Sequence, residues 1–145
     1  MVRICYVYET GRSGGRETRA GLLEVPARKN APHLLVVHSG AADLRLLRRI
    51  LSRDYRAGFA SALSAAQAYL CTQRPDALLL DVRLWADSRA QTETLLHAWP
   101  AAFLAAVPED AARVCGVPEW RVIRWPAPEA QFLAALHAFL VREPA

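Results

Sequence analysis

Short apolar runs alternate with helical patterns from residue 33 almost to the end of the chain. Continuous apolar runs predict buried strands at Leu34–Val37, Ala77–Leu80 and Ala101–Val107. A second strand with a weaker pattern is predicted at Tyr55–Ala60, and a fifth strand at Trp120–Arg124. Strand and helix alternate five times, a pattern typical of a parallel sheet with helices on both faces.

The helices between these strands are predicted from apolar residues at helical spacing and from their breakers. They cover residues 43–53, 61–73 and 88–99, a short helix from Pro108 to a C-cap at Gly116, and a last helix opened by Pro126 and Pro128. The residues after the third strand, through Trp85 and Asp87, are predicted as a loop.

Composition favours one compact intracellular domain. The chain has 145 residues, of which 53% are hydrophobic and 22% are charged. It has no signal-peptide layout and no apolar run near the roughly 18–20 residues that span a bilayer, so we expect a cytoplasmic protein without membrane contact. The three cysteines and four histidines are dispersed, so neither a disulfide framework nor a metal site is predicted.

Residues 1–31 differ from the rest of the chain. They carry a net charge of +3, whereas residues 32–145 carry +1. Met1–Tyr8 has the alternation of a short strand, and the glycine-rich Thr10–Arg16 lacks the ending of a phosphate-binding loop. We interpret residues 1–31 as a basic, partly flexible extension of a domain over residues 32–145. A nucleic-acid contact through this arm is an alternative to a solvated tail.

Asp81 directly follows the apolar run Ala77–Leu80. Ligands of open α/β sheets bind at the carboxyl ends of the strands, so a carboxylate there can be a working group or the remnant of one. Aspartate is also a common turn initiator, and Asp81 can instead simply end the strand and cap the following turn. The residues by themselves leave both interpretations open.

Five strand–helix units with an aspartate after the third strand resemble the receiver domain of bacterial two-component response regulators. The resemblance covers roughly residues 33–142, and its most specific parts are Pro75–Leu84, the first strand–helix unit and Trp125-Pro126. It implies a flavodoxin-like α/β fold with a five-stranded parallel sheet of order 2-1-3-4-5. It also implies that Asp81 is in the phosphoacceptor position, where a histidine kinase would supply the phosphoryl group.

The residues that support phosphorylation in receivers are replaced. Receivers hold Mg²⁺ with an acidic pair after the first strand, where this chain has His38 and Ser39. Mg²⁺ prefers oxygen ligands, and one carboxylate with a hydroxyl and an imidazole makes a poor site. We therefore expect no functional metal and no cofactor.

Three further positions depart from the receiver pattern. Ala105 stands where receivers have a hydroxyl residue ending strand four, and Trp125 replaces the lysine before the proline after strand five. Val122 falls at the position of the aromatic switch residue. Arg124 is basic, but it is one place away from the lysine position and is expected to point to the opposite face.

These departures favour a pseudo-receiver, a non-catalytic signalling domain that acts by binding a protein partner of unknown identity. A working phospho-receiver that accepts a phosphoryl group on Asp81 is the first alternative. Trp85 stands where receivers have a proline, and we expect one of Trp85 and Trp125 to fill the former site and the other to be exposed as an anchor.

The last third of the chain carries the predicted interface. The resemblance assigns the face that often mediates partner contacts in receivers to about residues 109–142. The last helix has more apolar positions than one stripe requires, and Leu133, Phe139 and Val141 are the candidate interface residues. We expect a constitutive homodimer through this face. The alternative is a wide stripe that is wholly buried.

Overall fold

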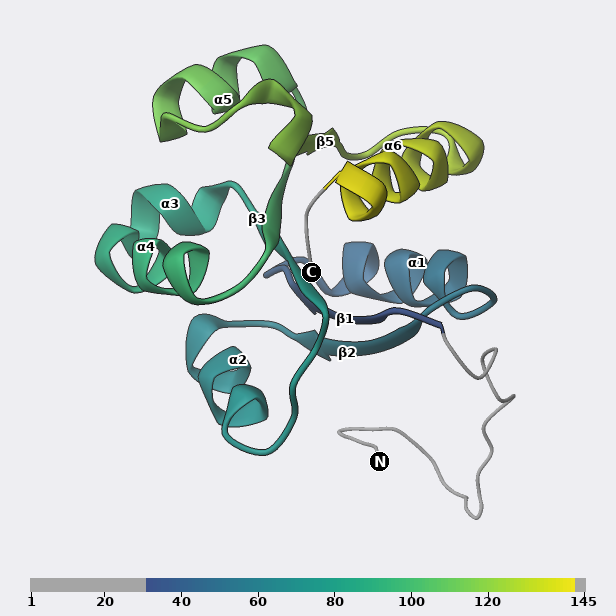
Figure 1. Ribbon diagram of the computed structural model, residues 1–145, viewed down its shortest axis with the longest axis horizontal. Helices are drawn as coiled ribbons and strands as arrows, with labels where there is room; N and C mark the ends of the chain where they lie inside the picture. Colours follow the sequence, from purple (N-terminus) through teal and green to yellow (C-terminus); the bar gives the residue numbers. More distant parts are fainter. Residues whose placement is uncertain (1–30, 143–145) are drawn as a thin grey trace. The chain divides into compact units, whose positions relative to one another are not determined.

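The computed structural model describes residues 31–142 (Figure 1). The strand order of its sheet is β2-β1-β3-β4-β5, which confirms the predicted flavodoxin-like order 2-1-3-4-5. The chain divides into two compact units, one up to Pro75 and one from Asp76 onward. The predicted strand Met1–Tyr8 and almost all of the basic extension lie outside the described residues.

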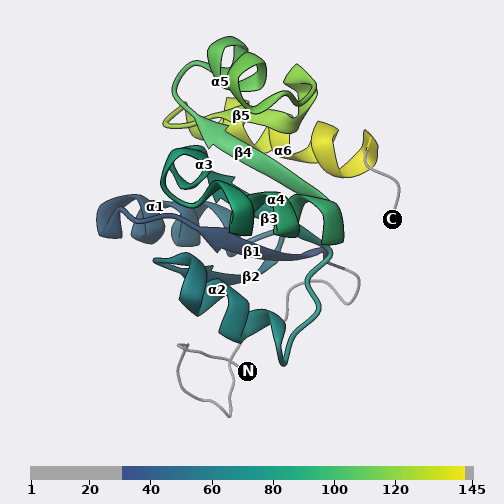
Figure 2. The same cartoon turned by 90° about the vertical axis from the view of Figure 1, so that its left-hand side faces the viewer.

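The first unit is a parallel strand pair between two helices. It contains β1 (His33–Val37), α1 (Ala41–Leu51), β2 (Arg56–Ala60) and α2 (Leu63–Leu70). β1 and β2 pair in parallel, from His33 opposite Arg56 to Val37 opposite Ala60. The two helices lie on opposite faces of this pair (Figures 1 and 2), which explains why every residue of β1 is buried.

Tyr69 fastens α2 to the strand pair. Its ring lies so close to Gly58 in β2 that a Cβ atom at residue 58 would come within 2.5 Å of ring carbons. Its hydroxyl is hydrogen-bonded to Nε2 of His33 in β1 at 2.5 Å. Glycine is therefore needed in the middle of β2 because an aromatic side chain occupies the space above it.

The second unit contains three strands and four helices. Its elements are β3 (Ala77–Asp81), α3 (Arg83–Asp87), α4 (Arg89–Ala98), β4 (Ala101–Ala105), α5 (Pro108–Cys115), β5 (Val122–Arg124) and α6 (Glu129–Arg142). β4 pairs in parallel with both β3 and β5. Figures 1 and 2 show α3 and α4 on one side of β3 and β4, with α6 on the other side.

Two local predictions in the second unit were wrong. The residues predicted as a loop after β3 form the short helix α3. Trp120 and Arg121, predicted as the start of the fifth strand, lie in a 3₁₀ turn, Glu119–Arg121, and the strand begins at Val122. Both segments are single turns, too short for helical periodicity to reveal them.

The backbone of Gly116 confirms the predicted end of α5. It has a left-handed conformation with φ of 69°, and its N–H donates to the carbonyl of Ala112.

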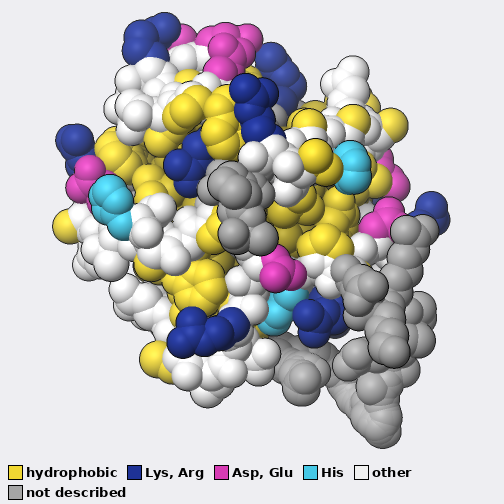
Figure 3. Space-filling model, in the orientation of Figure 1, with side chains coloured by type: hydrophobic (Ala, Val, Ile, Leu, Met, Phe, Trp, Pro, Cys, Tyr) yellow, Lys and Arg dark blue, Asp and Glu magenta, His cyan; other side chains and the backbone are white. Residues whose placement is uncertain are grey.

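Figure 3 shows acidic and basic side chains side by side over α5, where Asp110 and Arg113 form an exposed ion pair. No helix among residues 31–142 is both long enough and apolar enough to cross a membrane.

Candidate functional site at the carboxyl end of the third strand

Asp81 is the last residue of β3 and is almost wholly buried. It pairs in register with Leu104 of β4, and its relative exposure is 4%. The N–H of Val82 continues the ladder by donating to the carbonyl of Leu104. The carboxylate therefore leaves the sheet at the edge where ligands of open α/β sheets bind.

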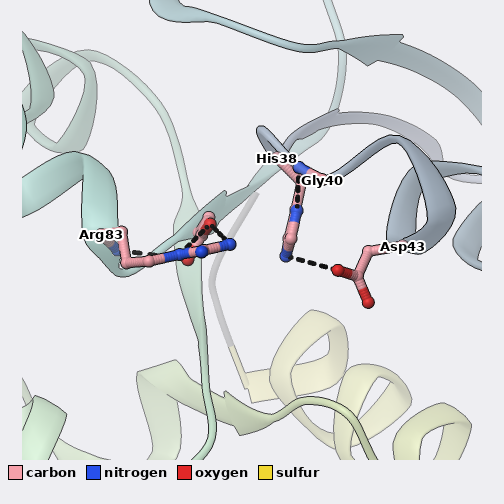
Figure 4. A network of polar contacts seen from close by, with 5 residues as sticks. His38, Gly40, Asp43 and Arg83 are labelled. Atoms are coloured by element: carbon pink, nitrogen blue, oxygen red, sulfur yellow. Dashed lines mark hydrogen bonds and ion pairs between the residues drawn. The ribbon is translucent and has the colours of Figure 1, made fainter.

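Arg83 contacts both oxygens of this carboxylate. The Arg83 backbone N–H donates to Asp81 Oδ1 at 3.1 Å, and the guanidinium reaches Oδ2 with Nε at 2.9 Å and Nη2 at 2.7 Å. In Figure 4 the Arg83 side chain lies across the ribbon, with dashed lines that join it to a carboxylate group. Asp81 thus caps the turn into α3 while a tethered cation neutralises its charge.

Trp85 and Trp125 are both buried, with relative exposures of 8% and 4%. The expectation that one of them is an exposed anchor was wrong. Trp85 packs edge-on against Phe103 of β4, with ring centroids 6.1 Å apart. Trp125 packs edge-on against Phe132 of α6, at 5.1 Å. Each indole packs against an aromatic ring of a neighbouring element, so neither tryptophan is available as an exposed anchor.

The guanidinium of Arg89 adds to the packing around Trp85. It lies 4.9 Å from the centroid of the indole ring, within the range of a cation–π contact. The buried Cys115 of α5 lies within the electrostatic reach of the same arginine. Burial raises the pKa of the Cys115 thiol, and the charge of Arg89 opposes that rise in part.

The remaining positions of the predicted site in the second unit have apolar side chains, and the side chain of the nearby Arg124 contacts the backbone instead. Ala105 and Val122 are buried, with no polar side-chain atom to offer. Arg124 is exposed, and its Nη1 donates to the backbone carbonyl of Ala106 at 2.9 Å. Its guanidinium is thus bonded to the loop after β4.

His38 and Ser39 lie at the carboxyl end of β1 in the first unit. His38 is buried, and its Nδ1 accepts a hydrogen bond from the N–H of Gly40 at 3.0 Å. Its Nε2 lies 3.8 Å from Oδ2 of Asp43. A dashed line marks this contact in Figure 4. Ser39 is exposed. Because Nδ1 accepts, a neutral His38 carries its proton on Nε2, facing the Asp43 carboxylate.

Taken unit by unit, the donors at these strand ends do not fit Mg²⁺, because a hard cation needs several oxygen ligands. In the second unit both oxygens of Asp81 accept from Arg83. In the first unit Nδ1 of His38 accepts from the backbone. Among residues 31–142, no group of three or more His, Cys, Asp or Glu side chains is placed to hold a metal ion.

The three predicted interface residues of α6 differ in exposure. Val141 is 72% exposed, and Leu133 is half-buried. Phe139 is only 1% exposed, so its assignment to the surface was wrong. Its ring lies 6.1 Å from that of Trp120, because α6 turns this side chain inward together with Phe132 and Leu136.

Arg83 is the site residue that the sequence reasoning missed. Its nearness to Asp81 in the chain is a weak signal, because side chains two residues apart share a face only while the strand continues. The chain turns at Val82 into α3, and this turn brings both the backbone N–H and the guanidinium of Arg83 onto the carboxylate. A sequence interpretation that places a loop here cannot predict that geometry.

Comparison with known proteins supports the fold. No family model and no curated protein matches the chain. A response regulator from Thermotoga maritima has a TM-score of 0.64 at 17% identity, covering 77% of this chain and 98% of that one. The non-phosphorylated HemR receiver domain from Leptospira biflexa has a TM-score of 0.61 at 23% identity, with 79% and 98% covered.

A third solved structure broadens the comparison. A putative pilus assembly protein (cpaE) from Burkholderia thailandensis has a TM-score of 0.57 at 26% identity, covering 77% of this chain and 99% of that one. The chain is thus similar over most of its length to solved receiver structures. The resemblance read from the sequence is confirmed at the level of the fold, which is that of response regulator receiver domains.

Proposed function

We propose that the chain is a receiver-like regulatory module that binds a protein partner in the cytoplasm and works without metal-dependent phosphorylation of Asp81. The contact between Arg83 and Asp81 carries this proposal. In a receiver, a divalent cation offsets the charge of the carboxylate and of the incoming phosphoryl group. Here a guanidinium two residues along the chain offsets the carboxylate in the resting protein.

The other substitutions support the same interpretation. Phosphoryl transfer needs charge stabilisation around three equatorial oxygens, supplied by cations and hydrogen-bond donors. Ala105 has no hydroxyl for this purpose, and Trp125 offers a packed indole where receivers have a lysine. A phosphoryl group on Asp81 would therefore lack the partners that stabilise it in receivers.

A working phospho-receiver is the second candidate. Asp81 keeps the strand-end position of a phosphoacceptor, and the Arg83 side chain is 63% exposed. A side chain with that much solvent around it can leave the carboxylate at modest cost. In this candidate Arg83 would move to the phosphoryl oxygens as a bidentate cation.

Intact-mass measurement after incubation with acetyl phosphate and Mg²⁺ separates the two candidates. We expect no phosphorylated species, and no saturable change in tryptophan fluorescence when Mg²⁺ or Mn²⁺ is titrated to millimolar concentration. Asp81→Asn is the matched control because it removes the acceptor oxygen and keeps the shape. Rapid stoichiometric labelling that Asp81→Asn abolishes would establish the phospho-receiver instead.

The partner is proposed to be a second copy of the chain, bound through α5, β5 and α6. Val114 and Val141 are the exposed apolar side chains of this face, at 68% and 72%. Sedimentation should give a dimer at micromolar concentration that acetyl phosphate does not change. Val141→Glu should shift it to a monomer, whereas Ala98→Glu on the exposed end of α4 should not. A monomer at every concentration would contradict this assignment.

A further inference from the structure

We propose that the exposed face of α1 and of the turn that follows it binds the phosphate backbone of nucleic acid. We call this surface the arginine face. It consists of Arg45, Arg48, Arg49 and Arg53, all of them exposed.

Charge is divided unevenly between the two units. Residues 31–75 hold six arginines and two aspartates, a net charge of +4, whereas residues 76–142 hold six arginines and eight acidic residues, a net charge of −2. The near neutrality of residues 32–145 as a whole therefore hides a basic unit and an acidic one. A basic surface on one element is the electrostatic signature of a polyanion partner.

Four of the six arginines in residues 76–142 have a charged or aromatic partner, and the other two, Arg121 and Arg124, donate to backbone carbonyls. In the second unit Arg83 pairs with Asp81, Arg89 with Glu93 and Arg113 with Asp110, while Arg142 lies over the ring of Trp120. Within the described part of the chain, no residue of the arginine face has an ion pair or a ring contact.

The spacing of the arginine face is unfavourable for the helix itself. Arg45 and Arg49 lie four residues apart on α1, with Arg48 beside them, which brings like charges close together on one side of the helix, and Arg53 adds a further cation in the turn after it. Arg48 and Arg49 lie in the last turn, where the helix dipole accounts for some of the preference for cations. The dipole does not account for Arg45 in the first half of the helix. An anionic partner would remove the repulsion along the whole row.

The residues around the arginine face indicate which kind of anionic partner it binds. The apolar residues Leu47, Ile50 and Leu51 of α1 are buried, with exposures of 0%, 6% and 0%. Among the described residues, the large hydrophobic side chains that are exposed all belong to the second unit. Membrane-binding helices insert an apolar face beside their basic residues, and protein interfaces are centred on apolar anchors. A surface that offers guanidinium groups without an apolar anchor is best suited to bind a phosphate backbone.

The dimensions fit a backbone of repeated charges. Arg45 and Arg49 lie four residues apart on α1, about 6 Å at the rise of an α-helix, and Arg53 follows in the turn after the helix. One strand of duplex DNA places a phosphate about every 3.4 Å along the axis, so Arg45 and Arg49 alone span about two phosphates. Arginine can also bind each phosphate with two parallel hydrogen bonds.

Fluorescence anisotropy with a labelled 25-base-pair DNA duplex of arbitrary sequence tests the proposal, using the full chain at salt concentrations from 50 to 200 mM. The variant R45Q/R49Q/R53Q removes three charges from the face. The matched control R89Q/R113Q/R142Q removes three charges from the second unit and leaves the same net charge. Circular dichroism and thermal unfolding check that both variants are folded.

We expect the unaltered chain to bind at 50 mM salt and the face variant to bind at least tenfold more weakly. Its slope of log affinity against log salt should be smaller by about 2–3, because each phosphate that the protein neutralises adds roughly 0.9 to that slope. The control should keep most of the affinity and slope. Equal losses in both variants, or undiminished binding by the face variant, would overturn the proposal. Binding to vesicles of anionic lipid that depends on the face, without DNA binding, would overturn it in favour of a membrane surface.

Discussion

The ion pair between Arg83 and Asp81 can be measured directly with a double-mutant cycle. The cycle compares the unaltered chain with Arg83→Ala, with Asp81→Asn and with the double variant, and takes the free energy of unfolding of each. The difference between the sum of the single effects and the double effect is the coupling energy of the two side chains. Asparagine keeps the volume of the aspartate, so the cycle reports charge and hydrogen bonding with little change in packing.

The geometry sets the expected size of this coupling. Breaking a fully buried pair costs about 3–5 kcal/mol, whereas an exposed pair is worth about 0.2–1 kcal/mol. Here the Asp81 side chain is 6% exposed, but the Arg83 side chain is 63% exposed, so solvent screens the cation. The backbone N–H of residue 83 also continues to donate to the carboxylate in Arg83→Ala. We therefore expect a coupling of about 1–1.5 kcal/mol, towards the exposed end of the range.

Urea unfolding followed by tryptophan fluorescence supplies the four free energies. The pair Arg89–Glu93 is the internal control, because its atoms lie 4.0 Å apart and its side chains are 68% and 46% exposed. Its coupling should stay below about 0.5 kcal/mol and should vanish at high salt. A coupling of Arg83 with Asp81 no larger than that of the control would refute the view that Arg83 replaces the charge of a metal at this carboxylate.

Four further predictions concern packing, titration and thiol accessibility. Gly58→Ala should destabilise the chain by about 1–3 kcal/mol in urea, because the new Cβ would overlap the Tyr69 ring at 2.5 Å, and a second substitution Tyr69→Leu should recover part of the loss. Phe132→Ala should cost about 3–5 kcal/mol, since the ring is 1% exposed, and a smaller loss would mean that α6 repacks. Burial raises the pKa of the Cys115 thiol, so the free energy of unfolding should fall as pH rises above about 8.5, where the unfolded thiol ionises first, and Cys115→Ala should weaken that fall. Iodoacetamide at pH 8, followed by peptide mass measurement, should label the exposed Cys71 well before Cys115; equal rates would show that Cys115 is accessible.

The sequence alone determined the alternation of elements and hence the class of fold. Leu34–Val37 and Ala77–Leu80 are continuous apolar runs, and a strand has this pattern when helices cover both of its faces. Gly116 marked the end of α5 because glycine adopts a left-handed backbone without steric cost. These signals act within a few residues, so they survive without any knowledge of the tertiary fold.

The burial of the two tryptophans and of Phe139 depended on the tertiary structure. An apolar residue on a helix shoulder or a strand-end loop has the same local signature whether a partner layer covers it or not. Trp85 is buried because Phe103 of β4 meets it edge-on, and Phe139 is buried because α6 turns it inward beside Trp120. The sequence supplied the side chains, and the packing of α3 and α6 decided their exposure.

The net charge summed along the chain likewise did not reveal the electrostatic features of the surface. A net charge of +1 over residues 32–145 averages a basic unit with an acidic one, so it concealed the arginine face on α1. The pairing of Arg83 with Asp81 needed the chain to turn at Val82, because only that turn aims the backbone N–H and the guanidinium of one residue at the same carboxylate. Periodicity along a sequence predicts which face of an element is buried, but only the path of the backbone decides which charges meet.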